Sequence, residues 1–511
     1  MRARPTRTRP WPPTTLPHDH TRRVDLLRTR VMDSVTPSGA VRGHCESRVL
    51  ESALLLALLR RTRTTPQAAR HLEQFLSART TGGDRIDDVL ARAATGNLRR
   101  EDDVKIRALV DEAPEFMRTR KHALIAATLC LLGRPQPHVA PPPIPAQGMH
   151  PAGRVQLIAI RVILAHAAGR PAPAAAHELL PATSAPRVWE GNLLVHLLAA
   201  NALSLLPGHE AAVAGGIRQA LACRRPDGGV PFVTGVDTWC TVTAGIALAS
   251  CGAPTAVQHR LARHLAAQQR ADGGWSYTDH AHHTDTDDTA VAVEFLHTLD
   301  PTRYRTPIDR GLAHLRSLQG PDGGFPTYVA GARSEAGMTA AAVNALSIRP
   351  SQHRPHIHAA LDFLTRAQRP DALFPPEWSR SRFHVAFRAL LAADAPYQRP
   401  APHGTDRRMV RTLLTAVLHH RNSDGGWGQQ PGECSDAIST AYALLCLCRH
   451  HAPRPAIEAA TFLLDTQRDD GSIASRPDML GTRPFLYNVP RLADHFALLA
   501  LGHLHQRLHG T

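Results

Sequence analysis

Residues 270–275 read Arg-Ala-Asp-Gly-Gly-Trp, and five more copies of this turn, some of them degenerate, occur between residues 225 and 472. An amphipathic stretch precedes each turn and a more apolar stretch follows it, both with apolar residues at helical spacing. Glycine ends the first helix because it adopts the left-handed conformation that a helix C-cap needs. Six helix pairs, counted from Ile217, predict a closed ring with apolar helices inside and amphipathic helices outside. The turn aspartates lie 45 to 53 residues apart, at Asp227, Asp272, Asp322, Asp371, Asp424 and Asp470.

The chain before these repeats also reads as helical, but no period is legible there. The full chain of 511 residues is too long to fold around a single hydrophobic core, which predicts two or three domains. We expect a disordered basic tail over residues 1–20 and a helical segment over 21–45 that packs on the C-terminal ring. Residues 46–210 are predicted to form a second helical domain, and residues 211–511 the ring itself.

The composition of the chain indicates which classes of partner it can have. The formal net charge is +15, but almost all of it comes from scattered arginines, and the chain has only two lysines, Lys105 and Lys121. No basic stripe interleaved with aromatic residues is present, so we expect no nucleic-acid partner. The eight cysteines form no CxxC pair, and no apolar run is long enough to span a membrane, which favours a reducing cytoplasm. The oligomeric state stays open, with a homodimer among the alternatives.

Residues 285–288, Asp-Thr-Asp-Asp, lead directly into one of the predicted inner helices. Aspartate and threonine are favoured at helix N-termini, so capping alone could explain them. Carboxylates crowded at the mouth of an apolar cavity, however, cannot all ionise, and at least one keeps its proton. Such a neutral acid could protonate an alkene or an epoxide. Asp287 is the predicted proton donor, with Asp285 and Asp288 as its supports.

Residues 285–290, Asp-Thr-Asp-Asp-Thr-Ala, resemble the DxDDTA signature of class II terpene cyclases, which include squalene-hopene cyclases and copalyl diphosphate synthases. The turns at Asp272 and Asp322, each preceded by glutamine, look like the QW repeats of that superfamily. The resemblance is clear over residues 187–505. It implies an all-α fold with two α/α-barrel domains, called β and γ, a cavity between them, and Asp287 as the catalytic acid. Length and motif position most resemble the short bacterial cyclases of linear prenyl diphosphates.

Other site residues are predicted more weakly. Trp239 and Trp378 lie near loops at the ends of the ring, where a ring face could stabilise a carbocation, although core packing is the simpler role. His280, His282 and His283 read as a hydrated loop rather than a metal site. Glu190 could hold Mg²⁺ together with a substrate diphosphate, although an exposed glutamate at a helix start is the simpler explanation. The candidate diphosphate-binding residues are three loop arginines: Arg333, Arg382 and Arg483.

Competing functions find less support in the sequence. Class I terpene chemistry needs a DDxxD motif, and Asp102-Asp103 is followed by the wrong residues. Protein prenyltransferases share the ring but need a zinc site, of which Asp237 and Cys240 are the only hint, at the wrong spacing. A non-catalytic toroid that binds a ligand remains an alternative, but it would have no reason to retain residues 285–288.

The sequence therefore predicts an enzyme that starts cyclisation of a linear prenyl diphosphate by protonation and leaves the diphosphate in place. Geranylgeranyl diphosphate, giving a labdane-type bicycle, is the first expected substrate. Farnesyl diphosphate, giving a drimane, is the second. A neutral polyprene of the squalene type is a further alternative. Mg²⁺ is expected to act through the diphosphate of the substrate.

Overall fold

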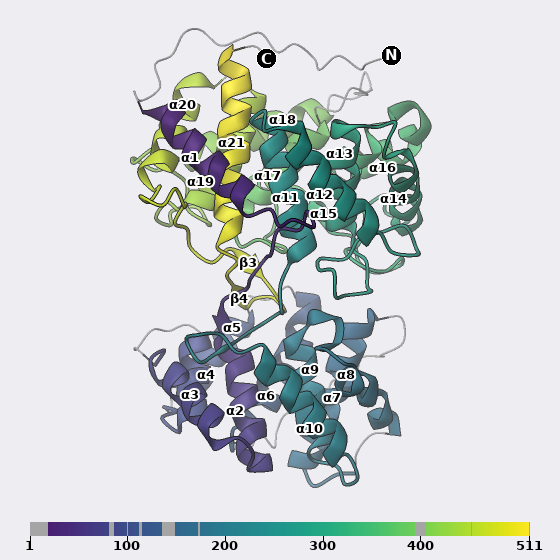
Figure 1. The fold of residues 1–511 in the computed structure, drawn as a ribbon, viewed down its shortest axis with the longest axis vertical. Coiled ribbons are helices and arrows are strands. Elements are labelled where there is room, and N and C mark those ends of the chain that lie inside the picture. The colour runs from purple at the N-terminus through teal and green to yellow at the C-terminus, as the bar shows by residue number, and fades with distance from the viewer. Residues whose placement is uncertain are drawn as a thin grey trace. The chain divides into compact units, whose positions relative to one another are not determined.

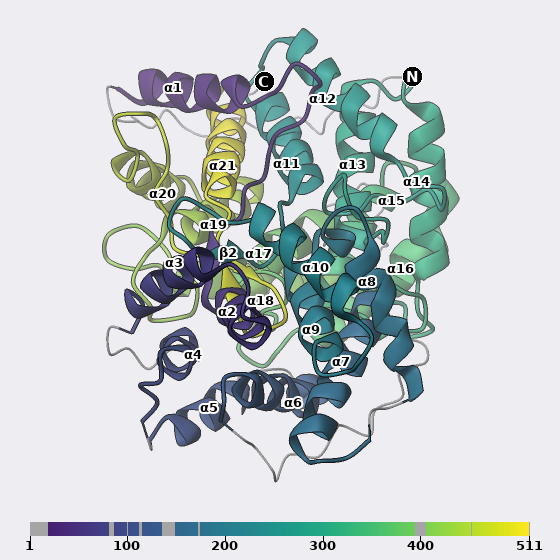
Figure 2. The same ribbon diagram turned by 60° about the horizontal axis from the view of Figure 1, so that its bottom comes forward.

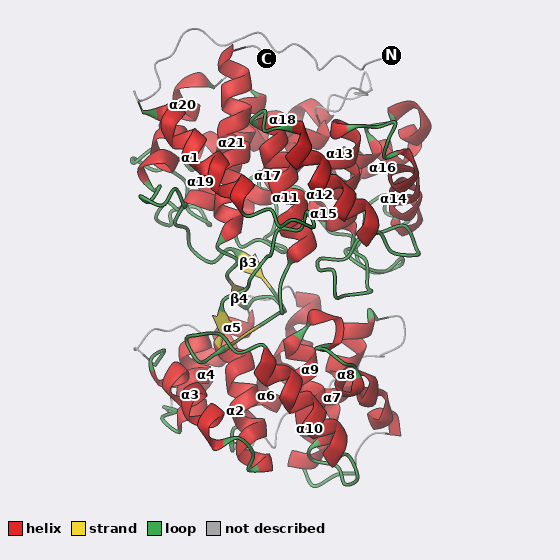
Figure 3. Ribbon diagram, in the orientation of Figure 1, coloured by secondary structure: helices red, strands yellow, loops and turns green. Residues whose placement is uncertain are grey.

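The computed structural model describes residues 19–80, 86–99, 101–111, 115–134, 149–171, 174–393, 405–450 and 452–509. Helices make up most of these segments, and the strands are only two residues long (Figure 3). The expected tail over residues 1–20 lies almost wholly outside the described residues. The chain divides into two compact units. Unit 1 comprises residues up to Gly43, Val236–Met479 and Asn488–Thr511, and unit 2 comprises His44–Gly235 and Leu480–Tyr487.

Unit 1 is a ring of helices in two layers, as the repeat predicts (Figure 1). Its inner helices contact one another in sequence, and the last of them contacts the first, which closes the ring. The inner helices are α11 (Asp237–Ser250), α13 (Thr286–Leu299), α15 (Ala336–Leu346), α17 (Arg382–Ala393), α19 (Ala437–Arg449) and α21 (Arg491–His509). The outer helices are α1 (His20–Asp33), α12 (Thr255–Gln268), α14 (Arg305–Leu318), α16 (Pro350–Ala367), α18 (Thr405–His419) and α20 (Pro453–Asp465).

Helix α1 is the sixth helix of the outer layer. The sequence analysis instead counted a helix that contains Ile217 as the first member of the six pairs. The count began at Ile217, which lies in α10 (Glu210–Ala222), but α10 belongs to unit 2 and packs against other helices there. The purple α1 instead lies beside the yellow α21 in both ribbon views and buries Leu27 and Val31 (Figures 1 and 2). The boundary of the ring therefore falls between Gly235 and Val236, not at residue 210.

Unit 2 is a second helical body around α2 and α9, whose side chains are buried along almost their whole length. Strand β1 (Ser47–Arg48) pairs antiparallel with β2 (Val230–Pro231), and β3 (Met479–Leu480) pairs with β4 (Leu486–Tyr487). Its helices before α10 are α2 (Val49–Thr62), α3 (Pro66–Ser77), α4 (Ile86–Thr95), α5 (Asp102–Asp111), α6 (Glu115–Leu131), α7 (Pro151–Ala167), η1 (Ala174–Leu179), α8 (Leu180–Ser184), η2 (Trp189–Gly191) and α9 (Leu193–Leu203).

The repeated turns join the two layers of the ring. In the second copy the amide of Trp275 donates to Thr289 Oγ1 of the following inner helix (2.9 Å), and the indole N–H of Trp275 donates to the carbonyl of Leu265 in the preceding outer helix (2.7 Å). Trp427 makes the same pair of bonds in the fifth copy. These tryptophans are fully buried, so they pack the ring and do not line its mouth.

The fourth turn keeps the conformation of the others without their glycines. Ala372 has a φ of 65°, although the glycines at the corresponding position of the other copies have φ near 80–90°. Arg382 of α17 supports this turn, because its guanidinium donates twice to Asp371 and once to the carbonyl of Phe374. All three donor nitrogens of Arg382 are thus used to hold its own repeat together.

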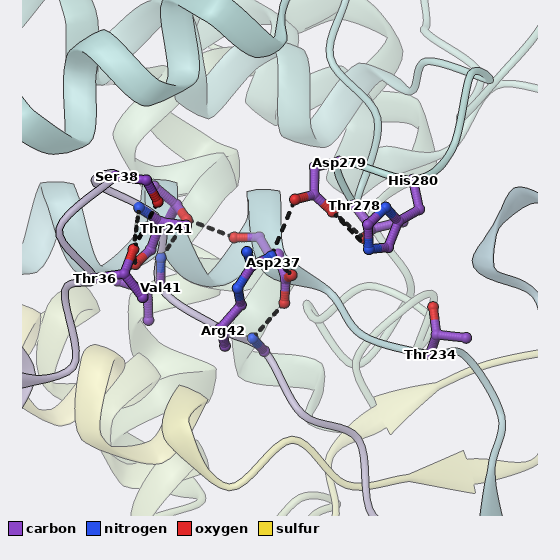
Figure 4. Close-up of polar contacts among 12 residues, drawn as sticks. Thr36, Ser38, Val41, Arg42, Thr234, Asp237, Thr241, Thr278, Asp279 and His280 are labelled. Carbon is purple, nitrogen blue, oxygen red and sulfur yellow. Dashed lines mark hydrogen bonds and ion pairs between the residues drawn. The ribbon is translucent and has the colours of Figure 1, made fainter. Parts of the chain in front are cut away.

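An N-terminal strap, residues 34–43, fastens α1 to the start of α11 (Figure 4). The buried Asp237 accepts from the backbone amide of Gly43 (2.7 Å) and from Arg42 Nη1 (2.6 Å). The same Arg42 nitrogen lies 3.0 Å from Asp279, in the loop that leads to residues 285–288. Asp237 therefore ties together the strap and the first inner helix.

We predict that Ala372→Gly stabilises the protein. A non-glycine residue in the left-handed region destabilises the folded state by about 1–2 kcal/mol. Glycine removes this strain, and the extra conformational entropy that it loses on folding costs less than the strain. A net gain of about 0.5–1 kcal/mol should appear as a higher thermal midpoint. Ala367→Gly, at the end of helix α16, should be neutral or destabilising as a matched control. An equal or lower midpoint for Ala372→Gly would contradict this account of the turn.

We also predict that Asp237→Ala destabilises unit 1 far more than Arg42→Ala. The first change leaves the buried Gly43 amide without its acceptor, at about 2 kcal/mol. The second removes an ion pair whose arginine side chain is 43% exposed, which is worth less than about 1 kcal/mol. Thermal melts followed by circular dichroism would rank the two variants, and equal losses would show that the ion pair, not the buried amide contact, holds the strap.

Candidate active site

Residues 285–288 form the first turn of α13, and both flanking loops hold them in place. Asp285 is the N-cap: its side chain accepts from the amide of Asp288 (2.8 Å), and its own amide donates to the carbonyl of Trp275 (2.9 Å). Thr286 is fully buried and bonds the next repeat, through its hydroxyl to the carbonyl of Pro326 (2.6 Å) and its amide to that of Thr327 (2.8 Å). The capping role is therefore real for Asp285, and it fixes the position of the other two carboxyls.

The three carboxyls are crowded in a poorly hydrated place. Burial raises the pKa of Asp285 to about 7, and the charge of Asp287 adds to the rise. Burial, together with Asp285 and Asp287, holds the pKa of Asp288 well above its usual range. Asp288 Oδ1 has no hydrogen-bond partner within the described chain. The group therefore retains a proton near neutral pH, as the crowding argument predicts.

Asp287 differs from its two neighbours because it faces an arginine. Arg388 Nη2 of α17 donates to Asp287 Oδ1 at 2.6 Å, across 101 residues of sequence. Burial raises the pKa of Asp287, and the Arg388 charge opposes that rise. Asp287 also keeps the most exposure of the three, with 15% of its side chain accessible. A partly accessible acid beside a cation is well suited to release a proton, because Arg388 stabilises the carboxylate that remains.

Aromatic side chains gather on the inner helices close to this pair. Phe387, Tyr442 and Phe496 contact one another, with ring centroids 4.8–6.3 Å apart, and His384 lies against all three. Burial lowers the pKa of His384 to about 3, so it is a neutral ring. Such faces can stabilise a positive charge in an apolar place.

The two predicted wall tryptophans occupy different places. Trp239 lies near Arg388, whose Cζ is 6.0 Å from the centre of its ring. Trp378 instead contacts Tyr328 edge-on and donates its indole N–H to Thr327 Oγ1 (3.0 Å). Thr327 is the residue whose carbonyl accepts from the motif residue Thr286, so Trp378 supports the loop beside the motif.

A cavity of about 360 Å³ lies inside the ring of unit 1. Five of the inner helices line it, from Trp239 in the first turn of α11 to Ser250 at the end of that helix, so it follows the axis of the ring. Arg388 lines this axial cavity and also holds Asp287. The other charged or polar lining groups are Thr243, Ser250, Glu294, Thr298, Arg449, His503 and Gln506.

The predicted arginines do not gather around the motif. Arg333 is exposed in the loop after the third turn, and Arg382 is committed to the fourth turn through Asp371. The structure thus gives Arg382 a structural role that its loop-edge position in the sequence did not reveal. Arg483 is buried in unit 2, and so is Glu190, which has a left-handed backbone in the short helix η2.

Metal ligation by side chains finds no support within the described residues, where no group of three histidine, cysteine, aspartate or glutamate side chains is arranged to hold an ion. His280 and His282 are exposed, as a hydrated loop would have them, and His283 is half-buried. The described helices also include none with the length and apolarity to cross a bilayer.

Two residues of this site, Arg388 and Glu294, were not predicted. Each is a charged residue between apolar neighbours in the middle of an inner helix, α17 and α13 respectively. A charge in such a position must find a partner or a cavity, and that signal was available in the sequence. The sequence did not reveal that Arg388 pairs with Asp287, because α17 and α13 come together only in the folded ring.

Comparison with known proteins agrees with this site. Residues 191–373 and 379–482 match the prenyltransferase alpha-alpha toroid domain family. The chain is 38% identical to a drimenyl diphosphate synthase of Streptantibioticus cattleyicolor, over 94% of each chain, and 36% identical to one of Streptomyces showdoensis, over 93% of each. Its fold resembles ent-copalyl diphosphate synthase from Streptomyces platensis, with a TM-score of 0.58, 19% identity, and coverage of 94% of this chain and 99% of that one. This chain belongs to the class II terpene cyclases.

Proposed function

We propose that this enzyme cyclises farnesyl diphosphate by protonating its terminal alkene from Asp287, and that the product keeps the diphosphate. The observation that carries the proposal is the crowded group of three carboxyls at the start of α13, of which Asp287 accepts a hydrogen bond from Arg388. The relatives of highest listed identity are named for drimenyl diphosphate, a bicyclic C15 product, and cover nearly all of the chain. This moves farnesyl diphosphate ahead of geranylgeranyl diphosphate, which the sequence put first.

The division of labour among the carboxyls follows from their contacts. One carboxylate oxygen of Asp285 accepts the hydrogen bond that caps α13, so this side chain is held in place by a structural contact. Asp288 is buried beside Asp285, and burial together with the charges of Asp285 and Asp287 holds its pKa well above the usual range. Asp287 has the most accessible side chain of the three, a pKa that burial raises, and a cation that stabilises the anion left behind. These properties support Asp287 as the donor and its neighbours as the groups that keep it protonated.

A diphosphate needs a cationic site, and unit 2 contains a buried group of cations. Lys121 on α6 is 2% exposed, and burial together with Arg120, Arg483 and Arg48 holds its pKa well below the usual range. Burial and Arg483 also lower the pKa of Arg120. Within this group, Arg48 donates two hydrogen bonds to the carboxylate of Glu51. A bound polyanion would relieve this repulsion, which supports the group as the diphosphate site.

Mg²⁺ fits this proposal as an ion carried by the substrate. Mg²⁺ commonly binds through one or two carboxylates together with substrate phosphates and keeps several waters. Glu190 in unit 2 is the candidate protein ligand, by its residue type and its place in the same unit as the cations. We place the reaction in the cytoplasm, in keeping with the free cysteines of the chain.

The proposed function is tested by incubating the purified enzyme with farnesyl and geranylgeranyl diphosphate. We expect a bicyclic C15 product that still carries its diphosphate, with no release of pyrophosphate, because protonation and not ionisation starts the reaction. Asp287→Asn should lower turnover by several powers of ten with an unchanged circular dichroism spectrum. Asp285→Asn and Asp288→Asn should be milder. Stoichiometric pyrophosphate release, or near-normal turnover by Asp287→Asn, would overturn the proposal, and a C20 product would restore the other substrate.

The diphosphate site is tested by Lys121→Met, with Lys105→Met as the matched control. Lys105 is the only other lysine and lies on α5 beside Glu101, outside the buried group of cations. Losing one charge-assisted contact of about 1.5–3 kcal/mol should raise KM about 10- to 100-fold in Lys121→Met and leave Lys105→Met near the wild type. Inorganic pyrophosphate, measured by calorimetry, should bind Lys121→Met correspondingly less tightly. Equal pyrophosphate affinity in both variants would place the diphosphate elsewhere.

A further inference from the structure

Glu294 is a half-buried carboxyl in the wall of the axial cavity, with 26% of its side chain exposed, and the proposed protonation step does not use it. It lies seven residues after Asp287 on α13, which is two helical turns along the same face. Both Glu294 and Arg388 line the axial cavity. A carboxylate in such a place is costly to keep unless a cation or a proton balances it.

Arg388 stands between the two carboxyls. Its Nη2 donates to Asp287 Oδ1 at 2.6 Å, and its Nη1 lies 3.8 Å from Glu294 Oε1. That second distance is an electrostatic contact and not a hydrogen bond, and Glu294 Oε1 has no bonding partner in the described residues. One guanidinium therefore interacts with two carboxyls. How strongly it stabilises the ionised form of one carboxyl depends on whether the other is charged.

We infer that Glu294 tunes the catalytic acid: through the Arg388 that they share, it keeps Asp287 in the proton-donating form. The inference rests on the proposed role of Asp287 and adds a second carboxyl to the acid. When Glu294 is neutral, Arg388 acts on Asp287 alone and favours its ionised form. When Glu294 is ionised, it offsets the charge of Arg388, and Asp287 keeps its proton to a higher pH.

The groups that face Glu294 allow this switch in the neutral range. Arg388 from α17 and Arg449 from α19 favour its ionised form, and Asp287 on its own helix opposes it. His503 of α21 also lines the axial cavity, but burial lowers its pKa to about 4, so it is neutral there. Thr243 of α11 and Gln506 of α21 contribute no charge. Burial, the largest influence, raises the pKa of Glu294 to about 7.

The sign of the effect follows from these charges. Below about pH 6 Glu294 is neutral in the wild type, so Glu294→Gln changes little. Above about pH 7.5 the wild type gains a negative charge that the variant lacks, so Asp287 in the variant loses its proton at a lower pH. A shift of one pKa unit is a tenfold change in the protonated fraction on the alkaline limb.

The test is the pH dependence of kcat for the wild type and for Glu294→Gln. We expect turnover within twofold of the wild type at pH 6 and about a tenfold loss at pH 8.5, with the alkaline limb moved about one unit lower. Glu294→Asp, which restores the charge, should recover part of the loss. Glu458→Gln is the matched control, because Glu458 also pairs with arginines but lies on the outer helix α20. Glu458→Gln should leave the profile unchanged.

A uniform loss by Glu294→Gln at every pH would show a structural role and overturn the inference. An unchanged profile would overturn it as well. If Glu294→Gln does not fold, Glu294→Met fills a similar volume without a charge and carries the same comparison. The proposed function fails separately, because a wild type that yields no cyclic diphosphate, or an active Asp287→Asn, defeats the role of Asp287 itself.

Discussion

One hydrogen bond recurs in every copy of the turn, and the ring depends on it. The carboxylate of the turn aspartate accepts from the backbone amide two residues later, at 3.0–3.2 Å, from Asp227 through Asp470. This bond closes the turn between the helix before it and the inner helix that follows. In the second copy, the loop after the turn leads into α13, whose first turn carries the acid.

The acid site combines two requirements that oppose each other. A proton donor must be neutral before it acts, which burial and crowding ensure, yet its anion must be stable afterwards, which needs a cation. The structure separates these tasks between helices. The carboxyls come from the first turn of α13, where the repeat fixes them, and the cation comes from the middle of α17. A change in how the ring closes would therefore alter the strength of the acid without touching the motif.

Much of the ring could be predicted from the sequence because its information is local. A turn, its glycine and the helices on either side lie within one period, so the inner helices and the crowding of Asp285, Asp287 and Asp288 were all legible. The packing of the segment over residues 21–45 on the ring was predicted, and the contacts of α1 with α21 and α11 confirm it. The count of pairs nevertheless took α10 for the sixth outer helix, because α1 and its partner α21 lie at opposite ends of the chain. The same reason hides the Arg388–Asp287 pair. Arg382 was misread because a lost glycine in the turn gave no hint that an arginine would support it.

The common direction of the inner helices has an electrical consequence. Each inner helix is followed by an outer one that returns, so the N-termini of all six described inner helices point toward one end of the ring, the end that carries Asp287. Helix N-termini carry a partial positive charge. Together they attract the carboxylate that Asp287 leaves behind and repel a cation formed next to it. In the proposed reaction each ring closure moves the positive charge further along the chain and away from these N-termini. Their field, which acts over about one helical turn, therefore favours the first steps of the cascade and discourages the return of the proton to its donor.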